Sequence, residues 1–208
     1  MLEFGVASTD FALTLECFIF AGILGSLSGP VSPIRFWFIA FYAATAVAAL
    51  TGGIVHAYLP NHKSLAYGIL WRATLIAIGA SALAGILVSA IVYFQSPTPT
   101  VLTRAVFLLF VVYCAVVIFY RDEFLVAIVG YLPMVVFLCF VFFRGYLHGR
   151  GQMYLAGAVG GCIALIAAAV QRLNLKNAPR WFNHNVAYHI LQGTGLLVVF
   201  FPALDLSR

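Results

Sequence analysis

Residues 64–94 read SLAYGILWRATLIAIGASALAGILVSAIVYF, and in these 31 residues Arg72 is the only charged side chain. A helix needs about 20 consecutive apolar residues to cross the hydrocarbon core of a bilayer, so this run is long enough to span it with some tilt. The rest of the chain is similar, because 64% of its 208 residues are hydrophobic and 8% are charged. Soluble domains carry roughly 25% charged residues. The sequence therefore predicts an integral membrane protein.

Seven apolar runs of this kind are separated by short segments rich in polar residues, proline or glycine. Only helices and closed barrels satisfy their backbone in lipid, and continuous apolar runs exclude the alternating strands of a barrel. We predict an all-α fold, a polytopic bundle of seven transmembrane helices in one domain, with the two termini on opposite sides. The predicted helices comprise residues 11–27, 33–58, 64–94, 101–120, 124–143, 152–173 and 183–204, and the loops include residues 96–100 and 174–180.

The net charge of +5 does not indicate a nucleic-acid partner, because the basic residues stand singly near helix ends, where they anchor to lipid headgroups. They divide equally between the two sides, so the positive-inside rule assigns no orientation. One side holds Lys63, Arg121, Arg172, Lys176 and Arg180, and the other holds Arg35, Arg104, Arg144, Arg150 and Arg208. The four cysteines lie within apolar runs without a Cys-x-x-Cys pair, and so predict neither a disulfide nor a zinc framework.

Four ionisable side chains lie at a similar depth on one side of the predicted bundle. Glu16, His56, Arg72 and His189 should all lie roughly 6–12 Å below the surface at which the first, third and seventh helices begin. A charge at that depth costs at least a few kcal/mol unless it is paired or hydrated. We therefore predict a polar pocket between the first, second, third and seventh helices, with Arg72 paired to Glu16 or facing water. The alternatives are a purely structural Glu16–Arg72 salt bridge and a purely structural hydrogen bond between the two histidines.

The start of the seventh helix carries further polar residues. Asn185, His189 and Gln192 are spaced i, i+4 and i+7 and share one helix face. Asn183 is a plausible N-cap, and His184 reaches the same face only if the first turn is frayed. Amide side chains on an otherwise apolar face need a partner, which a metal, its water or a lipid headgroup would supply. By contrast, His62 and His148 are interpreted as interfacial residues.

Seven helices, a histidine that ends the second, and the spacing Asn185-x-x-x-His189 in the seventh resemble the alkaline ceramidase and progestin/adipoQ-receptor superfamily. Members of that superfamily hold zinc with the histidine of the second helix and a His-x-x-x-His pair on the seventh. His56 and His189 match two of these ligands, whereas Asn185 occupies the position of the third. Gly52 stands where the family has a serine, and the third helix offers Arg72 in place of the family's acid.

The resemblance implies a zinc-dependent hydrolase that cleaves an amide or ester bond of a membrane lipid. In that reading His56 and His189 bind zinc, with His184 or Asn185 completing the site. Glu16 would accept the proton of the zinc-bound water, and the oxyanion would be stabilised by Arg72 or by the hydroxyls of Thr51 and Tyr188. Two other classes stay open: a non-catalytic sensor or receptor that binds lipid or a small molecule, and a transporter or haem protein with both histidines as axial ligands.

Overall fold

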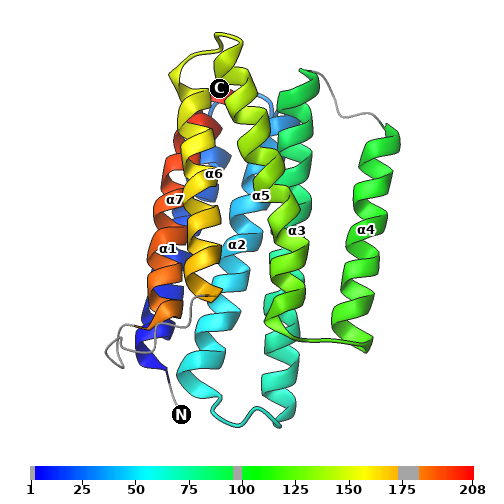
Figure 1. The fold of residues 1–208 in the computed structure, drawn as a ribbon, viewed down its shortest axis with the longest axis vertical. Helices are drawn as coiled ribbons and strands as arrows, with labels where there is room; N and C mark the ends of the chain where they lie inside the picture. The colour runs from blue at the N-terminus through cyan, green and yellow to red at the C-terminus, as the bar shows by residue number, and fades with distance from the viewer. Residues whose placement is uncertain (1–2, 96–99, 173–182) are drawn as a thin grey trace.

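The computed structural model describes residues 3–95, 100–172 and 183–208, which form seven α-helices and, within these ranges, no strand (Figure 1). Each helix is long and apolar enough to cross a membrane, and the two termini lie at opposite ends of the bundle. The predicted all-α, seven-helix architecture is confirmed. The helices are α1 Phe4–Ser26, α2 Pro33–Tyr58, α3 Leu65–Phe94, α4 Thr100–Phe119, α5 Phe124–Leu147, α6 Gln152–Arg172 and α7 His184–Leu206.

The predicted boundaries are close to the observed ones except at the start of α1 and the end of α5. The helix α1 begins at Phe4 rather than at residue 11, because the Thr9 hydroxyl donates to the carbonyl of Val6 instead of capping a later helix start. The helix α5 continues to Leu147 rather than to residue 143. Most of the loop predicted at residues 96–100, the whole loop at 174–180 with two of the basic residues counted above, and residue 173 lie outside the described residues.

Side-chain caps fix the start of α2 and of α7, as the sequence predicts. Ser32 accepts a hydrogen bond from the backbone N–H of Arg35, and the following proline takes the first helical position, where no N–H is required. The side chain of Asn183 accepts from the backbone N–H groups of Asn185 and Val186, both at 3.0 Å. The cap of α7 sets the conformation of the first turn, which carries Asn185.

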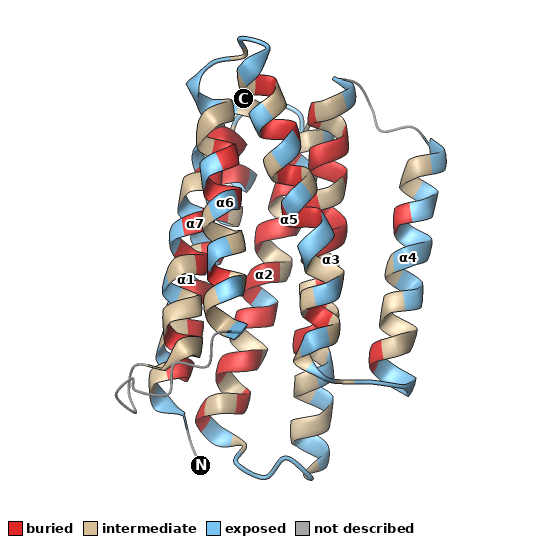
Figure 2. Ribbon diagram, in the orientation of Figure 1, coloured by how far each residue is buried: buried red, intermediate tan, exposed pale blue. Residues whose placement is uncertain are grey.

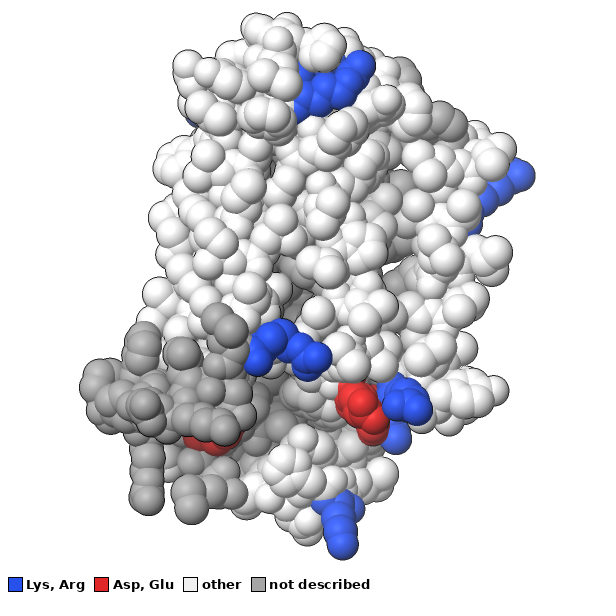
Figure 3. Space-filling model, viewed as in Figure 1, with Lys and Arg blue, Asp and Glu red and all other residues white. Residues whose placement is uncertain are grey.

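Six helices pack around a common core, and α4 stands outside it (Figures 1 and 2). The helix α4 contacts mainly α3, and of its residues Val106 and Val117 are buried. The buried positions of the other helices face one another, as Figure 2 shows by colour. In the view of Figure 3, Lys and Arg lie toward the two ends of the molecule, and a broad band without charge lies between them. This distribution is what a lipid-facing surface requires.

Glycines allow α6 to approach α7 and α5 closely. A Cβ atom on Gly160 would lie 2.8 Å from the carbonyl oxygen of Gly195 in α7, so neither position accommodates a side chain. On the α5 side, a Cβ on Gly157 would lie 2.4 Å from the ring of Phe142. The small residues of α6 therefore let it pack closely against both neighbours, and these contacts hold one wall of the bundle in place.

A buried arginine joins the end of α1 to the start of α2. Arg35 is 2% exposed, and its guanidinium donates hydrogen bonds to four backbone carbonyls at the end of α1: those of Leu24, Gly25, Leu27 and Ser28. The last carbonyls of a helix have no partner within the helix, so the side chain supplies the missing donors. Arg35 therefore has a structural role that its position at a helix end did not indicate.

Candidate functional site

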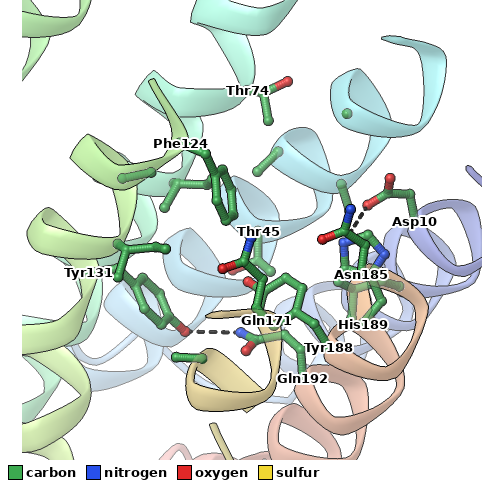
Figure 4. Close-up of a pocket in the computed structure, with 18 of the residues that line it drawn as sticks. Asp10, Thr45, Thr74, Phe124, Tyr131, Gln171, Asn185, Tyr188, His189 and Gln192 are labelled. Atoms are coloured by element: carbon green, nitrogen blue, oxygen red, sulfur yellow. Dashed lines mark hydrogen bonds and ion pairs between the residues drawn. The ribbon is translucent and has the colours of Figure 1, made fainter. Parts of the chain in front are cut away.

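A cavity of about 240 Å³ lies inside the bundle, between the ends of α2 and α6 and the starts of α3 and α7. All helices except α4 contribute described residues to its walls, and it reaches inward as far as Thr45 and Ser81. The walls are mostly apolar. Several of the lining side chains are polar and are labelled in Figure 4: Asp10, Gln171, Asn185, Tyr188, His189 and Gln192. An apolar cavity with a few convergent polar groups is the usual form of a small-molecule site.

His189 connects α7 to α1 at the wall of this cavity. Its Nε2 lies 3.3 Å from Oδ1 of Asp10, and its Nδ1 lies 2.9 Å from the hydroxyl oxygen of Thr9 (Figure 4). The Thr9 hydroxyl also lies 2.8 Å from the carbonyl oxygen of Val6, so it joins the imidazole to the backbone of α1. Both ring nitrogens are thus engaged, and the orientation of the imidazole is fixed.

The second oxygen of Asp10 is buried and has no hydrogen-bond partner among the described residues. Asp10 as a whole is 5% exposed and lines the cavity. Gly52 of α2 faces this carboxylate, and a Cβ at Gly52 would lie 3.7 Å from Oδ2. A buried carboxylate oxygen without a donor is costly, so Asp10 offers an acceptor to whatever enters the cavity.

His56 lines the same cavity from the end of α2, and its imidazole pairs with a different carboxylate, that of Glu3. Its Nδ1 lies 2.8 Å from Oε2 of Glu3, and the backbone N–H of Glu3 donates to the carbonyl of His56 at 3.1 Å. The pair is about one-quarter to two-fifths exposed, which places it nearer the solvent than the Asp10–His189 pair. The prediction that His56 and His189 contribute to one pocket is supported, although each histidine has its own acid.

A second set of polar groups lies on the side of the cavity formed by α5, α6 and α7. The side-chain amide of Gln192 donates to the hydroxyl of Tyr131 at 3.1 Å. Oε1 of Gln171 is buried and has no partner within the described part of the chain. In the view of Figure 4, Gln171 and Tyr188 lie between the Tyr131–Gln192 pair and the Asp10–His189 pair. Two unpartnered acceptor oxygens therefore belong to residues that line one cavity.

Glu16 and Arg72 do not line the cavity, and the predicted pair between them is wrong. Glu16 follows Asp10 by six residues, a rotation of about 240° around α1, and its side chain packs instead beside Gly193 of α7. Nη2 of Arg72 lies 3.2 Å from Oδ2 of Asp122 in the turn before α5, with both side chains 45% exposed. Equal depth in the bundle did not imply a common direction.

The other predicted site residues divide between the cavity and its surroundings. Tyr188 and Asn185 line the cavity. His184 and Thr51 are not among the residues that line it; His184 is half-buried at the start of α7. The Thr51 hydroxyl lies 2.8 Å from that of Thr74, which faces the cavity in its place.

Asp10 is the main residue that sequence reasoning missed. Asp10 directly precedes the predicted start of the first helix at residue 11, so it was not predicted as part of a site. A signal was present, because Asp10 shares a face with Leu13, Thr14 and Cys17 at spacings of three, four and seven, and this face is buried. A carboxylate on the buried face of a membrane helix needs a partner from another helix.

The predicted zinc ligands are not gathered into a metal centre in the described part of the chain. Zinc requires about four ligands, of which three or more come from the protein. Within the described residues, no group of three His, Cys, Asp or Glu side chains is arranged to hold a metal ion. Both ring nitrogens of His189 and Nδ1 of His56 are engaged with hydrogen-bonding partners. Two of the predicted ligands, His56 and His189, are each hydrogen-bonded to an acidic side chain of α1 or its N-terminal flank.

Comparison with known proteins identifies a family but gives no activity. No curated protein and no solved structure matches the chain. Residues 6–208 match the family model described as a family of unknown function, DUF6962. This match covers all but the first five residues, including α1 with Asp10, α2 with His56 and α7 with His189. The chain therefore belongs to the DUF6962 family, and the seven-helix bundle with its internal cavity is a structure of that family.

Proposed function

We propose that this protein is a multi-pass integral membrane protein that binds a small amphipathic molecule in the cavity between its helices. The membrane assignment is supported by seven helices of sufficient length and apolar character, and by the uncharged band of Figure 3. Binding is supported by one observation above all: the cavity contains two buried oxygen acceptors, on Asp10 and Gln171, that no described residue satisfies. Buried polar groups are normally hydrogen-bonded, so a bound molecule is the simplest partner.

The size and lining of the cavity support a small ligand with an apolar body. Its volume of about 240 Å³ is just below the range of about 300–1,000 Å³ that is usual for drug-sized ligands. Apolar residues such as Ile78, Leu132 and Val135 line the interior part, where the hydroxyls of Thr45 and Ser81 bond to each other. Asp10 and His189 lie nearer the end of the bundle. A molecule with a polar group toward Asp10 and an apolar body toward the middle of the bundle would satisfy both regions.

A zinc-dependent lipid hydrolase is the second candidate, favoured by the presence of His56, His189 and Asp10 in one cavity. It requires His189 to give up Asp10 or Thr9 and turn one ring nitrogen toward a metal ion. The geometry supports a non-catalytic binding protein better, because both ring nitrogens of His189 already have partners. A protein that senses or carries a membrane-soluble molecule needs the cavity but no such rearrangement.

The proposal is tested by asking whether a molecule co-purifies with the protein in the cavity. We expect native mass spectrometry of the detergent-purified protein to detect a bound small molecule. Ala168→Trp places an indole in the cavity wall on α6 and should remove this molecule. Ile166→Trp on the same helix is the matched control, because that side chain is 55% exposed and does not line the cavity. A wild-type protein without any bound molecule, or equal binding by the Ala168→Trp variant, would contradict the proposal.

A further inference from the structure

The chemistry of the cavity walls specifies the ligand more closely. Resting on the proposed binding function, we propose that the ligand is a small apolar primary amine whose ammonium group pairs with the free oxygen of Asp10. Three independent features of the cavity carry this inference: the unsatisfied acceptors, the absence of basic residues among the described lining residues, and a row of aromatic rings.

The first feature is a pair of buried acceptor oxygens that have no donor among the described residues. Oδ2 of Asp10 is buried without a partner, while Oδ1 is 3.3 Å from Nε2 of His189. Oε1 of Gln171 is also unpartnered within the described residues. A ligand that carries only acceptors would leave both oxygens unsatisfied. An ammonium group brings three donors and no acceptor, and its hydrogen bond to a carboxylate is charge-assisted.

The second feature is the sign of the charge around the cavity. Asp10 is the acidic residue among those that line it, and none of the described lining residues is a lysine or arginine. The nearest described arginine on α3, Arg72, is occupied by Asp122 outside the cavity. A carboxylate or phosphate headgroup would therefore meet an acid without a compensating cation. A cationic group would instead neutralise a charge that is expensive to bury.

The third feature is a row of aromatic rings in the cavity wall. Trp71 of α3, Phe124 of α5 and Tyr188 of α7 all line the cavity. Their rings follow one another, with centroids 6.2 Å apart for Trp71–Phe124 and 6.4 Å for Phe124–Tyr188. The faces of aromatic rings attract cations, and several rings around one site are a common means of recognising ammonium groups. The same rings provide an apolar contact surface for the body of the ligand.

The experiment compares three probes of equal chain length that differ only in the polar group: n-hexylamine, hexan-1-ol and hexanoate. A cavity of about 240 Å³ has the volume of roughly eight waters, which suits molecules of seven or eight heavy atoms. Binding to the detergent-purified full chain is measured from the concentration dependence of the thermal unfolding midpoint. We expect hexylamine to bind at least tenfold more tightly than hexan-1-ol, and hexanoate to bind most weakly.

Two carboxylates on α1 provide a variant and its control. Asp10→Asn keeps the size of the side chain but removes its charge, and should weaken hexylamine binding on the order of 10- to 100-fold while leaving hexan-1-ol nearly unchanged. Glu16→Gln makes the same chemical change six residues away, outside the cavity, and should leave the affinity for hexylamine unchanged. If Asp10→Asn does not fold, the order of the three probes on the wild-type chain still decides the question.

The outcomes separate this inference from the proposed function. Equal or tighter binding of hexan-1-ol or hexanoate, no binding of hexylamine, or unchanged hexylamine binding by a folded Asp10→Asn variant would overturn the amine assignment. None of these results bears on whether a molecule of another class co-purifies with the wild-type protein and is displaced by Ala168→Trp. That separate experiment decides the binding function itself.

Discussion

Replacing Gly160 with alanine should destabilise the bundle, because the close contact between α6 and α7 has no room for a methyl group. The new Cβ would lie 2.7 Å from Cγ2 of Val199, 2.8 Å from the carbonyl oxygen of Gly195 and 3.0 Å from the backbone nitrogen of Val199. Two of these atoms belong to the backbone, so rotation of a side chain cannot relieve the overlap, and α6 has to move away from α7. Overpacking of this kind costs about 1–3 kcal/mol.

Alanine also has an intrinsic advantage that must be subtracted from this cost. In a helix it is favoured over glycine by about 0.5–1 kcal/mol. Gly22 of α1 isolates this term, because a Cβ at that exposed position would have nothing within 4 Å. Because both variants gain this advantage, the free energies of unfolding of Gly160→Ala and Gly22→Ala should differ by the overpacking cost alone, about 1–3 kcal/mol. For a chain of this size, that difference corresponds to a gap of roughly 2–12 °C between the unfolding midpoints.

The assay is thermal unfolding of each purified variant in the same detergent, followed by size-exclusion chromatography of the fraction that remains monodisperse. We expect Gly22→Ala to unfold at or slightly above the wild-type temperature and Gly160→Ala clearly below it. The reasoning would be refuted if the two variants unfolded at the same temperature. That result would mean that α6 and α7 can separate at little cost, and that the wall of the cavity carrying Gln171 is less fixed than the contact indicates.

Three further predictions follow from the contacts described above. Arg35→Met should lower the free energy of unfolding by at least about 2 kcal/mol, measured by the same thermal assay, because it leaves buried carbonyls at the end of α1 without donors; wild-type stability would contradict this role. Elemental analysis of protein purified without chelator should find no stoichiometric zinc, whereas one zinc per chain that is lost in both His56→Ala and His189→Ala would favour the hydrolase. Arg72→Ala should cost less than about 1 kcal/mol, because its pair with Asp122 is half exposed; a larger loss would show that the arginine has a partner within the bundle.

The sequence was sufficient to predict the seven helices, because length and apolar composition alone decide whether a segment can span a bilayer. The residues at which α2, α3 and α6 begin and end were placed within one or two positions for the same reason, aided by caps such as Ser32. The start of α1 was predicted too late, because Ser8, Thr9 and Asp10 are polar and resemble the segment that precedes a helix. In the structure the hydroxyls of Ser8 and Thr9 bond to carbonyls of their own helix, so the polar segment continues the helix.

The candidate site was predicted in part, and the errors have one physical cause. Counting residues from a helix end gives the depth of a side chain, and depth correctly placed His56 and His189 on one cavity. Depth does not determine the direction in which a side chain points around the helix axis. In the structure Glu16 points toward Gly193 and Arg72 toward Asp122. The rotation of a helix is set by its packing against neighbours, which a single sequence does not contain.

The pairing of α1 with α7 has a consequence for the biosynthesis of the protein. Thr9 and its partner His189 are 180 residues apart, so α1 is made long before α7 exists. At about 5–20 residues per second, the ribosome needs roughly 10–40 s to cover this distance. During that time Asp10 has no imidazole beside it, and a carboxylate in the membrane interior must be protonated, hydrated or shielded by the insertion machinery. The polar wall of the cavity is therefore the last part to assemble, and a nascent chain that stalls before α7 exposes an unpaired acid that membrane quality control can detect.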